Sequence, residues 1–393
     1  MHLDKIIIGV PREIMPGEKR VAAVPDTVGK MVASGARVLI ESGAGAGAYI
    51  DDAKYIEKGA EIVSDVRDIY SQANLILKVK EPRHHKELDR HEAELFPEKS
   101  VLICFLHPAH SVNHEGLKIL ARRGITSFTL DGIPRISRAQ QMDTLTSMST
   151  VAGYKAVIFA ANHLGRFIPM MPTSFGIIQP AQFLVIGTGV AGLQSIATAK
   201  RLGAKVKTLD IRPEANEQSR SLGAENVDFD VPQELAIGEG GYARRLPEEW
   251  YERERELLLP HVEQSDAIIL TALIPGEVAP TIINEKMIGN MKKGSVIIDV
   301  AVDQGGNCSL TRCGEEYEHE GITISGIMNV PATLPVDATN MFAQSLNNFL
   351  NYVLHENTIK TDNSDEIIQS TMVTHEGSIV HHGTLKAMEM EAN

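Results

Sequence analysis

Four polar residues that follow apolar, strand-like runs could act together on a 2-oxo acid: Arg20, Lys80, His107 and Asp303. An arginine grips a carboxylate through two parallel hydrogen bonds, and a lysine can donate to a carbonyl oxygen and withdraw charge from its carbon. A histidine passes a proton near neutral pH, and a carboxylate can orient ammonia or water. We therefore expect Arg20 and Lys80 to bind substrate. We expect Lys80, His107 and Asp303 to be catalytic.

Each of these residues also has a simpler explanation when it is taken alone. Arg20 would be a surface cation, and Lys80 would only pair with Glu81. His107 would be a half-buried imidazole with satisfied hydrogen bonds, and Asp303 would cap a turn. Their shared position favours the joint site, because ligands of open α/β sheets bind beyond the carboxyl ends of the strands.

A glycine-rich turn lies in the stretch 183–210, between an apolar strand-like run and a helical pattern. Gly187, Gly189 and Gly192 have the spacing G-x-G-x-x-G, and a second strand follows and ends on Asp210. The first glycine permits a tight turn, the second lets a pyrophosphate approach the backbone, and the third lets the helix pack on the strand. The free N–H groups at the helix start suit an anion. The complete unit predicts a dinucleotide site, although the glycines alone could serve only packing.

The cofactor predicted for this site is NAD. A carboxylate at Asp210 would accept hydrogen bonds from the adenosine ribose and repel a 2′-phosphate. Arg212, two residues later, would weaken that discrimination. Val190, the first residue of the helix, is expected to contact the cofactor together with the glycines.

Two further stretches each allow a functional and a structural interpretation. The segment 134–143, PRISRAQQMD, could hydrogen-bond a nicotinamide amide or dock a partner, or it could simply cap a helix. The segment 238–260 is glycine-hinged and then densely charged. It could be a lid over the cofactor or a solvated helix with charge pairs four residues apart.

Composition excludes several classes of protein. The chain has 393 residues and a net charge of −13, which argues against nucleic acid as a partner. Three cysteines without a C-x-x-C pair argue against a disulfide framework and fit a reducing cytoplasm. Cys104 and His107 are interpreted as a buried thiol and a functional imidazole, so no metal site is predicted. Neither a signal peptide nor a membrane-length apolar run is evident.

Strand-like and helix-like patterns alternate along nearly the whole chain, which predicts an α/β fold with parallel sheets. We expect two doubly wound, Rossmann-like domains with a cleft between them. Residues 1–136 and 335–393 would form the substrate domain, and 137–334 the NAD-binding domain. A long helix is expected over 137–167, leading into the second domain.

Several motifs resemble those of the alanine dehydrogenase / pyridine nucleotide transhydrogenase family, across nearly the whole chain. They are PRISRAQQMD, GTGVAGLQSIATAKRLGA, GGYAR, TALIPG, GSVIIDVAVDQGGNC and NVPATLP. They are most similar to the NAD(H)-binding component of proton-translocating transhydrogenase. The resemblance implies that Arg135, Gln140 and Asp143 lie by the nicotinamide and that Asn329 belongs to the cofactor site. It also implies that GGYAR is a mobile loop, which supports the lid.

Other positions are similar to alanine dehydrogenase instead. LKVKEP with Lys80, FLHPA with His107 and DVAVDQGG with Asp303 match that pattern, as do Arg20 in EKRVA and the late THEG. Transhydrogenase components usually lack this lysine and histidine.

We therefore expect a cytoplasmic, homo-oligomeric NAD(H)-dependent oxidoreductase that interconverts a 2-oxo acid and a small L-amino acid. The alternative is the soluble first portion of the alpha subunit of a proton-translocating NAD(P) transhydrogenase, peripheral to the inner membrane. That subunit would have separate membrane and NADP-binding subunits as partners. The resemblance implies a dimer for the transhydrogenase type and a hexamer for the dehydrogenase type.

Overall fold

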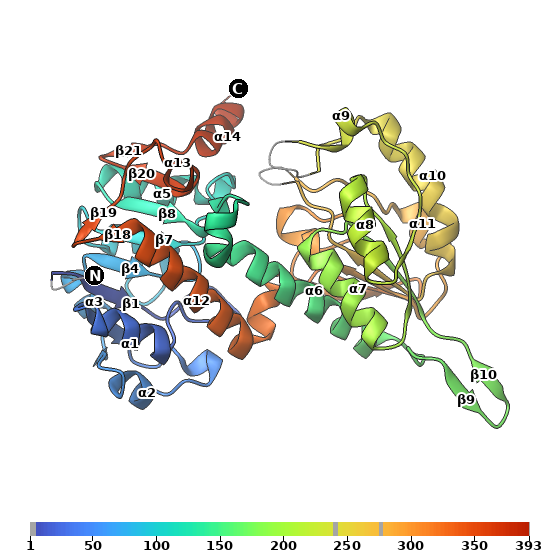
Figure 1. Cartoon of the computed structure of the whole chain (residues 1–393), viewed down its shortest axis with the longest axis horizontal. Coiled ribbons are helices and arrows are strands. Elements are labelled where there is room, and N and C mark those ends of the chain that lie inside the picture. Colours follow the sequence, from blue (N-terminus) through green and yellow to red (C-terminus); the bar gives the residue numbers. More distant parts are fainter. Residues whose placement is uncertain (1–4, 239–242, 275–277, 393) are drawn as a thin grey trace. The chain divides into compact units, whose positions relative to one another are not determined.

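The computed structural model describes residues 5–238, 243–274 and 278–392. It divides into two compact units, each with its own sheet (Figure 1). Unit 1 comprises Met1–Met148 and Ala332–Asn393, and unit 2 comprises Ser149–Pro331. Both units are mostly parallel α/β sheets with helices packed on them, so the predicted fold class is confirmed.

The sheet of unit 1 has eight strands in the order β21-β20-β8-β7-β4-β1-β2-β3. Its parallel strands are β1 (Ile7–Val10), β2 (Arg37–Glu41), β3 (Glu61–Val63), β4 (Leu75–Leu77), β7 (Val101–Cys104) and β8 (Thr126–Thr129). Most are short apolar runs buried on both faces, as parallel strands are. The chain returns from unit 2 to add β20 (Met372–His375) antiparallel to β8, followed by β21 (Ser378–Ile379).

The helices of unit 1 cover both faces of this sheet. They are α1 (Pro25–Ala33), α2 (Asp52–Ile56), α3 (Val66–Gln72), α4 (Glu92–Leu95), α5 (His114–Arg122), α12 (Pro335–Val353), α13 (Glu366–Thr371) and α14 (His382–Ala392). One face buries Ile69, Phe96 and Leu120 against strand residues such as Leu102 and Ile76. Two short antiparallel pairs, β5 (His84–His85) with β6 (Arg90–His91) and β18 (Leu354–His355) with β19 (Thr358–Ile359), lie outside the main sheet.

The long helix expected over 137–167 is wrong at its start. Residues Ser137–Met142 form a 3₁₀ helix, and α6 runs only from Thr144 to His163. The carboxylate of Asp143 accepts a hydrogen bond from the backbone N–H of Thr146 at 2.7 Å, as a helix-capping side chain does. The 3₁₀ segment is tied to α12, where Asn348 Nδ2 donates to the carbonyl of Gln141 at 2.9 Å. The first unit therefore extends to Met148.

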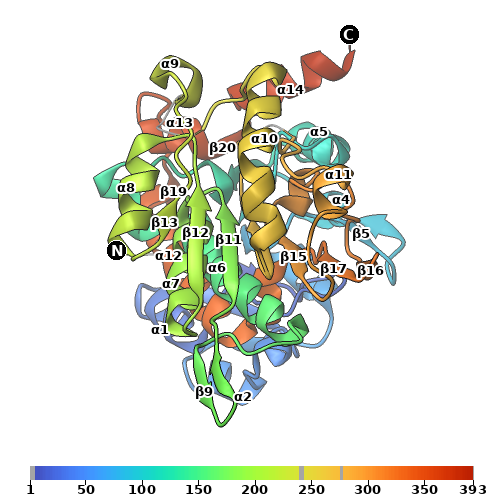
Figure 2. The ribbon, with the colours of Figure 1, turned by 90° about the vertical axis from the view of Figure 1, so that its right-hand side faces the viewer.

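The sheet of unit 2 has seven strands in the order β13-β12-β11-β14-β15-β17-β16. The parallel strands are β11 (Gln182–Ile186), β12 (Lys205–Leu209), β13 (Glu225–Asn226), β14 (Ala267–Leu270), β15 (Val296–Asp299) and β17 (Ile322–Ser325). The antiparallel edge strand is β16 (Glu316–His319). The order reverses between β11 and β14, and such a switch point is where doubly wound sheets bind ligands. β11 and β12 lie side by side in Figure 2.

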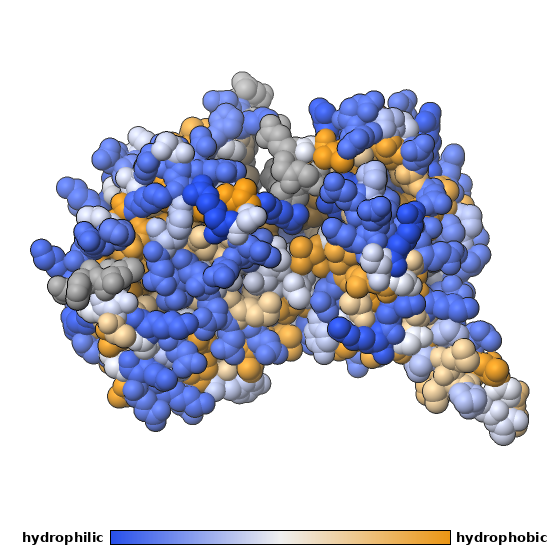
Figure 3. Space-filling model, in the orientation of Figure 1, coloured by the Kyte–Doolittle hydropathy of each residue, from blue (hydrophilic) through white to orange (hydrophobic). Residues whose placement is uncertain are grey.

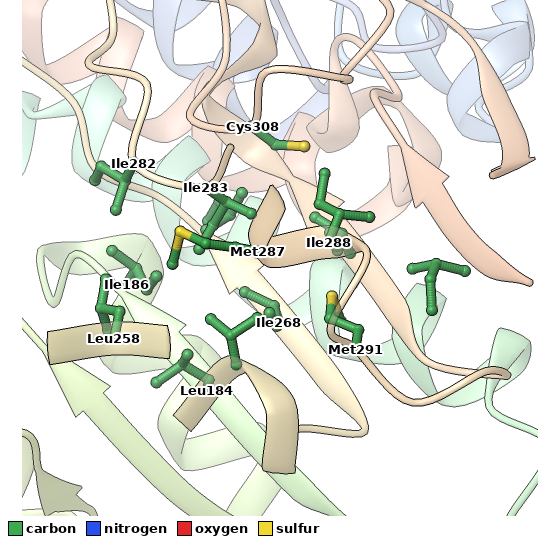
Figure 4. Packing of buried hydrophobic residues seen from close by; sticks show 14 of the residues in the cluster. Leu184, Ile186, Leu258, Ile268, Ile282, Ile283, Met287, Ile288, Met291 and Cys308 are labelled. Atoms are coloured by element: carbon green, nitrogen blue, oxygen red, sulfur yellow. The ribbon is translucent and has the colours of Figure 1, made fainter. Parts of the chain in front are cut away.

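The strand β11 buries alternate side chains on the two faces of this sheet. Leu184 and Ile186 pack with α10 (Glu248–Gln264) and α11 (Glu285–Ile288), as Figure 4 shows for Leu258 and Met287. Phe183 and its neighbours on the other face pack with α6 and α7 (Val190–Arg201). The remaining helices of the unit are α8 (Pro213–Ser221) and α9 (Gln233–Ala236).

A hairpin of β9 (Met171–Thr173) and β10 (Gly176–Ile178) projects from unit 2 (Figure 1). It replaces the simple connector that the Met- and Pro-rich sequence indicated. Its tip residue Phe175 is 99% exposed, and apolar side chains colour the arm in Figure 3. Within the described residues, no helix is both long enough and apolar enough to cross a membrane.

Candidate functional site

The three glycines of unit 2 are required by their surroundings in different ways. Gly187 has φ 83°, and a Cβ there would lie 2.8 Å from the backbone nitrogen of Ala272. A Cβ on Gly192 would lie 2.0 Å from the carbonyl oxygen of Gly187, so the helix can pack this closely only with glycine. A Cβ on Gly189 would meet only the guanidinium of Arg212, at 3.9 Å. Gly189 therefore leaves open space in front of the backbone, where the spacing predicts a pyrophosphate.

The helix α7 begins in this turn, directly after β11. Gly189 is its N-cap and Val190 its first residue, and the Gly189 carbonyl accepts the first helical hydrogen bond, from Leu193, at 2.8 Å. The N–H groups of the first turn have no partners within the helix, and they lie at the carboxyl end of the parallel strands. The arrangement can bind an anion through backbone donors.

Asp210 follows β12 and is buried, with both carboxylate oxygens occupied. Its Oδ2 accepts a hydrogen bond from the backbone N–H of Thr188 at 2.7 Å, inside the glycine turn. The guanidinium of Arg212 pairs with the same carboxylate, through Nε at 2.9 Å and Nη2 at 2.8 Å. The acid is thus fixed to the turn, and a cation partly neutralises it. Arg212 is close enough to weaken the rejection of a 2′-phosphate, as expected from the sequence.

Two other predicted residues of unit 2 lie in loops at the same end of its sheet. Asp303 is exposed in a 3₁₀ turn (Val300–Gln304) after β15. Asn329 follows β17, is nearly buried and has the left-handed φ of 50°. A non-glycine residue with positive φ is uncommon and is often found at functional sites. Their roles remain predictions.

Asp299, which the sequence analysis did not select, holds the Asp303 loop in place. Its Oδ2 accepts backbone N–H bonds from Asn307 at 2.8 Å and Cys308 at 3.0 Å. Burial raises the pKa of Asp299, and these hydrogen bonds oppose that rise. Asn307 in turn bonds both backbone groups of Ala272. An aspartate that ends a strand and precedes two glycines was the signal available in the sequence.

In unit 1, Lys80 and His107 are brought together around Glu81. Lys80 is largely buried after β4, and within the described residues no side chain accepts a hydrogen bond from its Nζ. Glu81 is buried, pairs with Arg83, and has one oxygen, Oε2, without a partner in the described structure. Burial alone would raise the pKa of Glu81, but the charges of His107, Lys80 and Arg83 lower it overall. The simple Lys80–Glu81 pair therefore belongs to a larger cluster.

His107 is held in an unusual conformation by Asp131, a second residue that sequence reasoning missed. Its φ is 44°, and its backbone N–H donates to Asp131 Oδ2 at 2.9 Å. Its Nδ1 lies 3.5 Å from Asp131 Oδ1, and its ring stacks on Phe105 with centroids 5.6 Å apart. A carboxylate beside Nδ1 fixes the ring and leaves the other nitrogen for proton transfer. No local pattern in the sequence links residues 107 and 131.

Arg20 is buried rather than a surface cation, and an internal carboxylate occupies its guanidinium. Its Nε and Nη2 donate to the two oxygens of Glu18, at 2.8 and 2.6 Å, and Nη1 lies 3.0 Å from the sulfur of Met148. This is the two-bond grip that was expected for a substrate carboxylate. A substrate would have to displace Glu18 or bind elsewhere on Arg20.

A buried charge network underlies Lys80. Lys78 Nζ lies 2.9 Å from Glu92 Oε1 and 3.5 Å from Glu13 Oε2, and all three side chains are almost fully buried. Glu13 also accepts the backbone N–H of Val79 at 2.6 Å, which anchors the segment that carries Lys80. Burial raises the pKa of Glu13 to about 7, although Lys78 opposes this. Burial would lower the pKa of Lys78, but the two carboxylates raise it overall.

The segment 134–143 lies in unit 1. Arg135 and Gln140 are exposed, and Asp143 caps α6. The capping explanation therefore holds for Asp143, and the nicotinamide roles remain predictions. In the segment 238–260, residues 239–242 lie outside the described residues, and so does most of GGYAR. From Glu248 onward that segment belongs to α10, which packs on the sheet through Leu258.

No group of three or more His, Cys, Asp or Glu that could hold a metal ion occurs in the described ranges. Cys104 is buried, and burial raises the pKa of its thiol.

The glycine turn at the switch point, with Asp210 beyond the next strand, defines a dinucleotide-binding α/β protein with two Rossmann-like units. Family models for the alanine dehydrogenase/PNT N-terminal domain and C-terminal domain match residues 9–152 and 156–382. The chain belongs to the alanine dehydrogenase/PNT family, as the motifs indicated. It is accordingly an oxidoreductase that uses NAD(H).

Relatives of both predicted types are similar to the chain. The first portion of NAD(P) transhydrogenase subunit alpha of Rhodospirillum rubrum, a separate chain in that organism, is 43% identical over 377 residues, covering 95% of this chain and 97% of that protein. Alanine dehydrogenase of Methanococcus maripaludis is 30% identical over 346 residues, covering 85% and 83%.

Solved structures of both types also match. The transhydrogenase of Sinorhizobium meliloti has a TM-score of 0.81 and 35% identity, covering 96% of this chain and 99% of that one. An L-alanine dehydrogenase has a TM-score of 0.82 and 26% identity, covering 98% and 99%. The fold does not separate the two types, whereas sequence identity favours the transhydrogenase alternative over the dehydrogenase that we placed first.

Proposed function

We propose that the chain is the NAD(H)-binding alpha-type subunit of a proton-translocating NAD(P) transhydrogenase. The observation that carries this proposal is the 43% identity to the Rhodospirillum rubrum alpha-subunit chain along nearly its whole length, against 30% for alanine dehydrogenases. The reaction moves one hydride, with its two electrons, from NADH to NADP⁺ and gives NAD⁺ and NADPH. It needs no other reactant, so the protein's task is to bind and orient.

In this proposal the residues of unit 2 hold the cofactor. Gly187, Gly189, Gly192 and Val190 would surround the pyrophosphate, with donors from the start of α7. Asp210 would accept the adenosine ribose hydroxyls. The nicotinamide end would involve Arg135, Gln140, Asp143 and Asn329, by resemblance to the family.

The partners in this proposal are separate chains. One chain would bind NADP(H) and another would span the membrane, as the name of the Rhodospirillum rubrum relative suggests. The chain itself would act at the membrane surface, as a homo-oligomer.

The test is hydride exchange with a separate NADP(H)-binding partner. The purified chain would be mixed with such a domain, and NADPH would be offered with an NAD⁺ analogue whose reduced form absorbs at a distinct wavelength. We expect turnover that needs both proteins and is lost in an Asp210→Ala variant. Tight NADH binding without any exchange, together with turnover of an oxo acid, would contradict the proposal.

A second function, the oxidative deamination of a small amino acid, is favoured by the cluster in unit 1. Lys80 Nζ has no hydrogen-bond acceptor in the described structure, and His107 is oriented by Asp131. These groups suit a 2-oxo acid, with Lys80 on the carbonyl oxygen and His107 moving the proton. The Glu18 carboxylate on Arg20 argues against it, because it occupies the expected carboxylate grip.

The second function has its own assay, which is NADH oxidation with ammonium and a panel of 2-oxo acids beginning with pyruvate. Activity that disappears in His107→Ala and Lys80→Ala would establish it. A Glu18→Gln variant sharpens the test, because it frees the guanidinium of Arg20. If activity appears only in that variant, the wild-type chain is not an amino-acid dehydrogenase.

A further inference from the structure

The helix α10 buries an acidic residue on the stripe that faces the sheet. The buried positions of this helix are Tyr251, Glu254, Leu258 and Val262, spaced three and four residues apart as on one face of an amphipathic helix. Glu254 is only 2% exposed, and its Oε2 has no hydrogen-bond partner within the described structure. An unpaired carboxyl group in a core position costs stability, so packing does not explain it.

The neighbours of Glu254 on this stripe place it beside the ribose end of the dinucleotide site. One turn later, Leu258 shares a core cluster with Leu209, the last residue of β12. Figure 4 shows Leu258 close to β11. One turn earlier, Tyr251 belongs to the cluster that packs with Ile211. Glu254 therefore faces the residue between Leu209 and Ile211, which is the aspartate predicted to bind the ribose.

The charged and titratable groups around Glu254 come from two elements. Asp210 and Arg212 follow β12, and Tyr251 and Arg255 belong to α10. Burial, and after it the charge of Asp210, raise the pKa of Glu254 to about 8, while Arg255 opposes both. Glu254 is thus uncharged at neutral pH and ionises slightly above it, where the carboxylate of Asp210 and the two arginines do not titrate.

We propose that Glu254 is a specificity-determining residue of the dinucleotide site, which acts through Asp210 on the rejection of a 2′-phosphate. With Glu254 uncharged, an incoming phosphate would meet Asp210 already neutralised by Arg212. With Glu254 ionised, one uncompensated negative charge is added next to that pair. The adenosine ribose of NADH carries no charge at the 2′ position, so its affinity changes much less. This proposal rests on the proposed binding of NAD(H) at Asp210.

The test compares the dissociation constants of NADPH and NADH, measured on the full chain by nucleotide fluorescence between about pH 7 and 9.5, across the ionisation of a group with its pKa near 8. In the wild type the ratio of NADPH to NADH constants should rise about tenfold over this range, the effect of one added charge near a dianion. In Glu254→Gln, which keeps the shape of the protonated acid, the ratio should stay at its low-pH value. Glu252→Gln removes an exposed charge from the same helix and should behave as the wild type.

The outcomes separate this proposal from the one beneath it. A rise in Glu254→Gln that parallels the wild type would overturn the role of Glu254, and so would a flat ratio in all three chains. If NADH bound to none of them, the NAD(H) site itself would be disproved, and the role of Glu254 with it.

Discussion

The two units have the same kind of sheet but form its carboxyl edge from different groups. In unit 2 the edge consists mainly of glycines and backbone N–H groups, with one aspartate tied to the turn by Thr188. In unit 1 the edge consists of charged side chains that bond one another, such as Glu13 with Lys78 and His107 with Asp131. A backbone edge suits a phosphate-bearing cofactor, whereas a side-chain edge suits acid–base chemistry or a rigid support.

The difference teaches that similar folds can divide binding and reactivity between them. The backbone edge depends on the shape of the turn, so it is sensitive to added atoms and charges. The side-chain edge depends on charge balance, so it is sensitive to the loss of one partner and to pH. Four predictions test this distinction, and they are ordered by the size of the expected effect.

Removing Lys78 should have the largest effect. Lys78→Met leaves Glu13 and Glu92 buried without their cation, which is expected to lower the free energy of unfolding by about 3–5 kcal/mol. Denaturant unfolding at neutral pH measures the change. The surface pair Arg37–Glu61 supplies the control, because both side chains are about half exposed and Arg37→Met should leave the midpoint unchanged. An equal shift in both variants would show that the network contributes no more than a surface pair.

A charge at Gly189 should abolish cofactor binding without unfolding unit 2. Space is open around this position, so Gly189→Asp should fold, but its carboxylate would repel a pyrophosphate. We expect the NADH dissociation constant to rise about 100-fold, with the thermal midpoint almost unchanged. Gly189→Ala is the matched steric control and should bind within a few-fold of the wild type. Normal NADH affinity in the aspartate variant would place the cofactor elsewhere.

The pH dependence of stability should contain a component from Glu13. Its pKa in the folded chain is about 7, above the ordinary value of 4.5, so the unfolded chain loses this proton first as pH rises. Stability from this group therefore falls between about pH 4.5 and 7, by roughly 2 kcal/mol, and stays constant above that range. In Glu13→Gln the fall should be absent, which chemical unfolding across pH can detect. A steeper fall in the variant would contradict the assignment.

Much of the fold and of unit 2's site was predictable from the sequence, because the information is local. The glycine spacing, the flanking strands and Asp210 lie within one stretch of the chain, and each glycine has the steric reason expected of it. The relation between His107 and Asp131 was not predictable. Those residues come from the ends of neighbouring strands β7 and β8 and meet only when the sheet forms.

The Arg20 prediction shows the same limit in another form. Its burial and its pairing with Glu18, two residues earlier, depend on how the loop after β1 folds. Motif positions alone also placed the dehydrogenase first, although identity along the whole chain favours the transhydrogenase. A few catalytic side chains match a pattern without stating which reaction they serve.

The smallest expected effects come from deleting one hydroxyl group in each unit. Tyr70 donates to Glu92 in the charge network at 3.1 Å, and Thr271 donates to the carbonyl of Gly187 at 2.7 Å. Tyr70→Phe and Thr271→Val should each lower the free energy of unfolding by about 1–2 kcal/mol, the usual effect of losing a buried hydrogen bond. Only Thr271→Val should also weaken NADH binding, by a few-fold, because it loosens the turn that would hold the pyrophosphate. Equal losses of NADH affinity in the two variants would mean that both edges contribute to the cofactor site, and the division between binding and reactivity would be wrong.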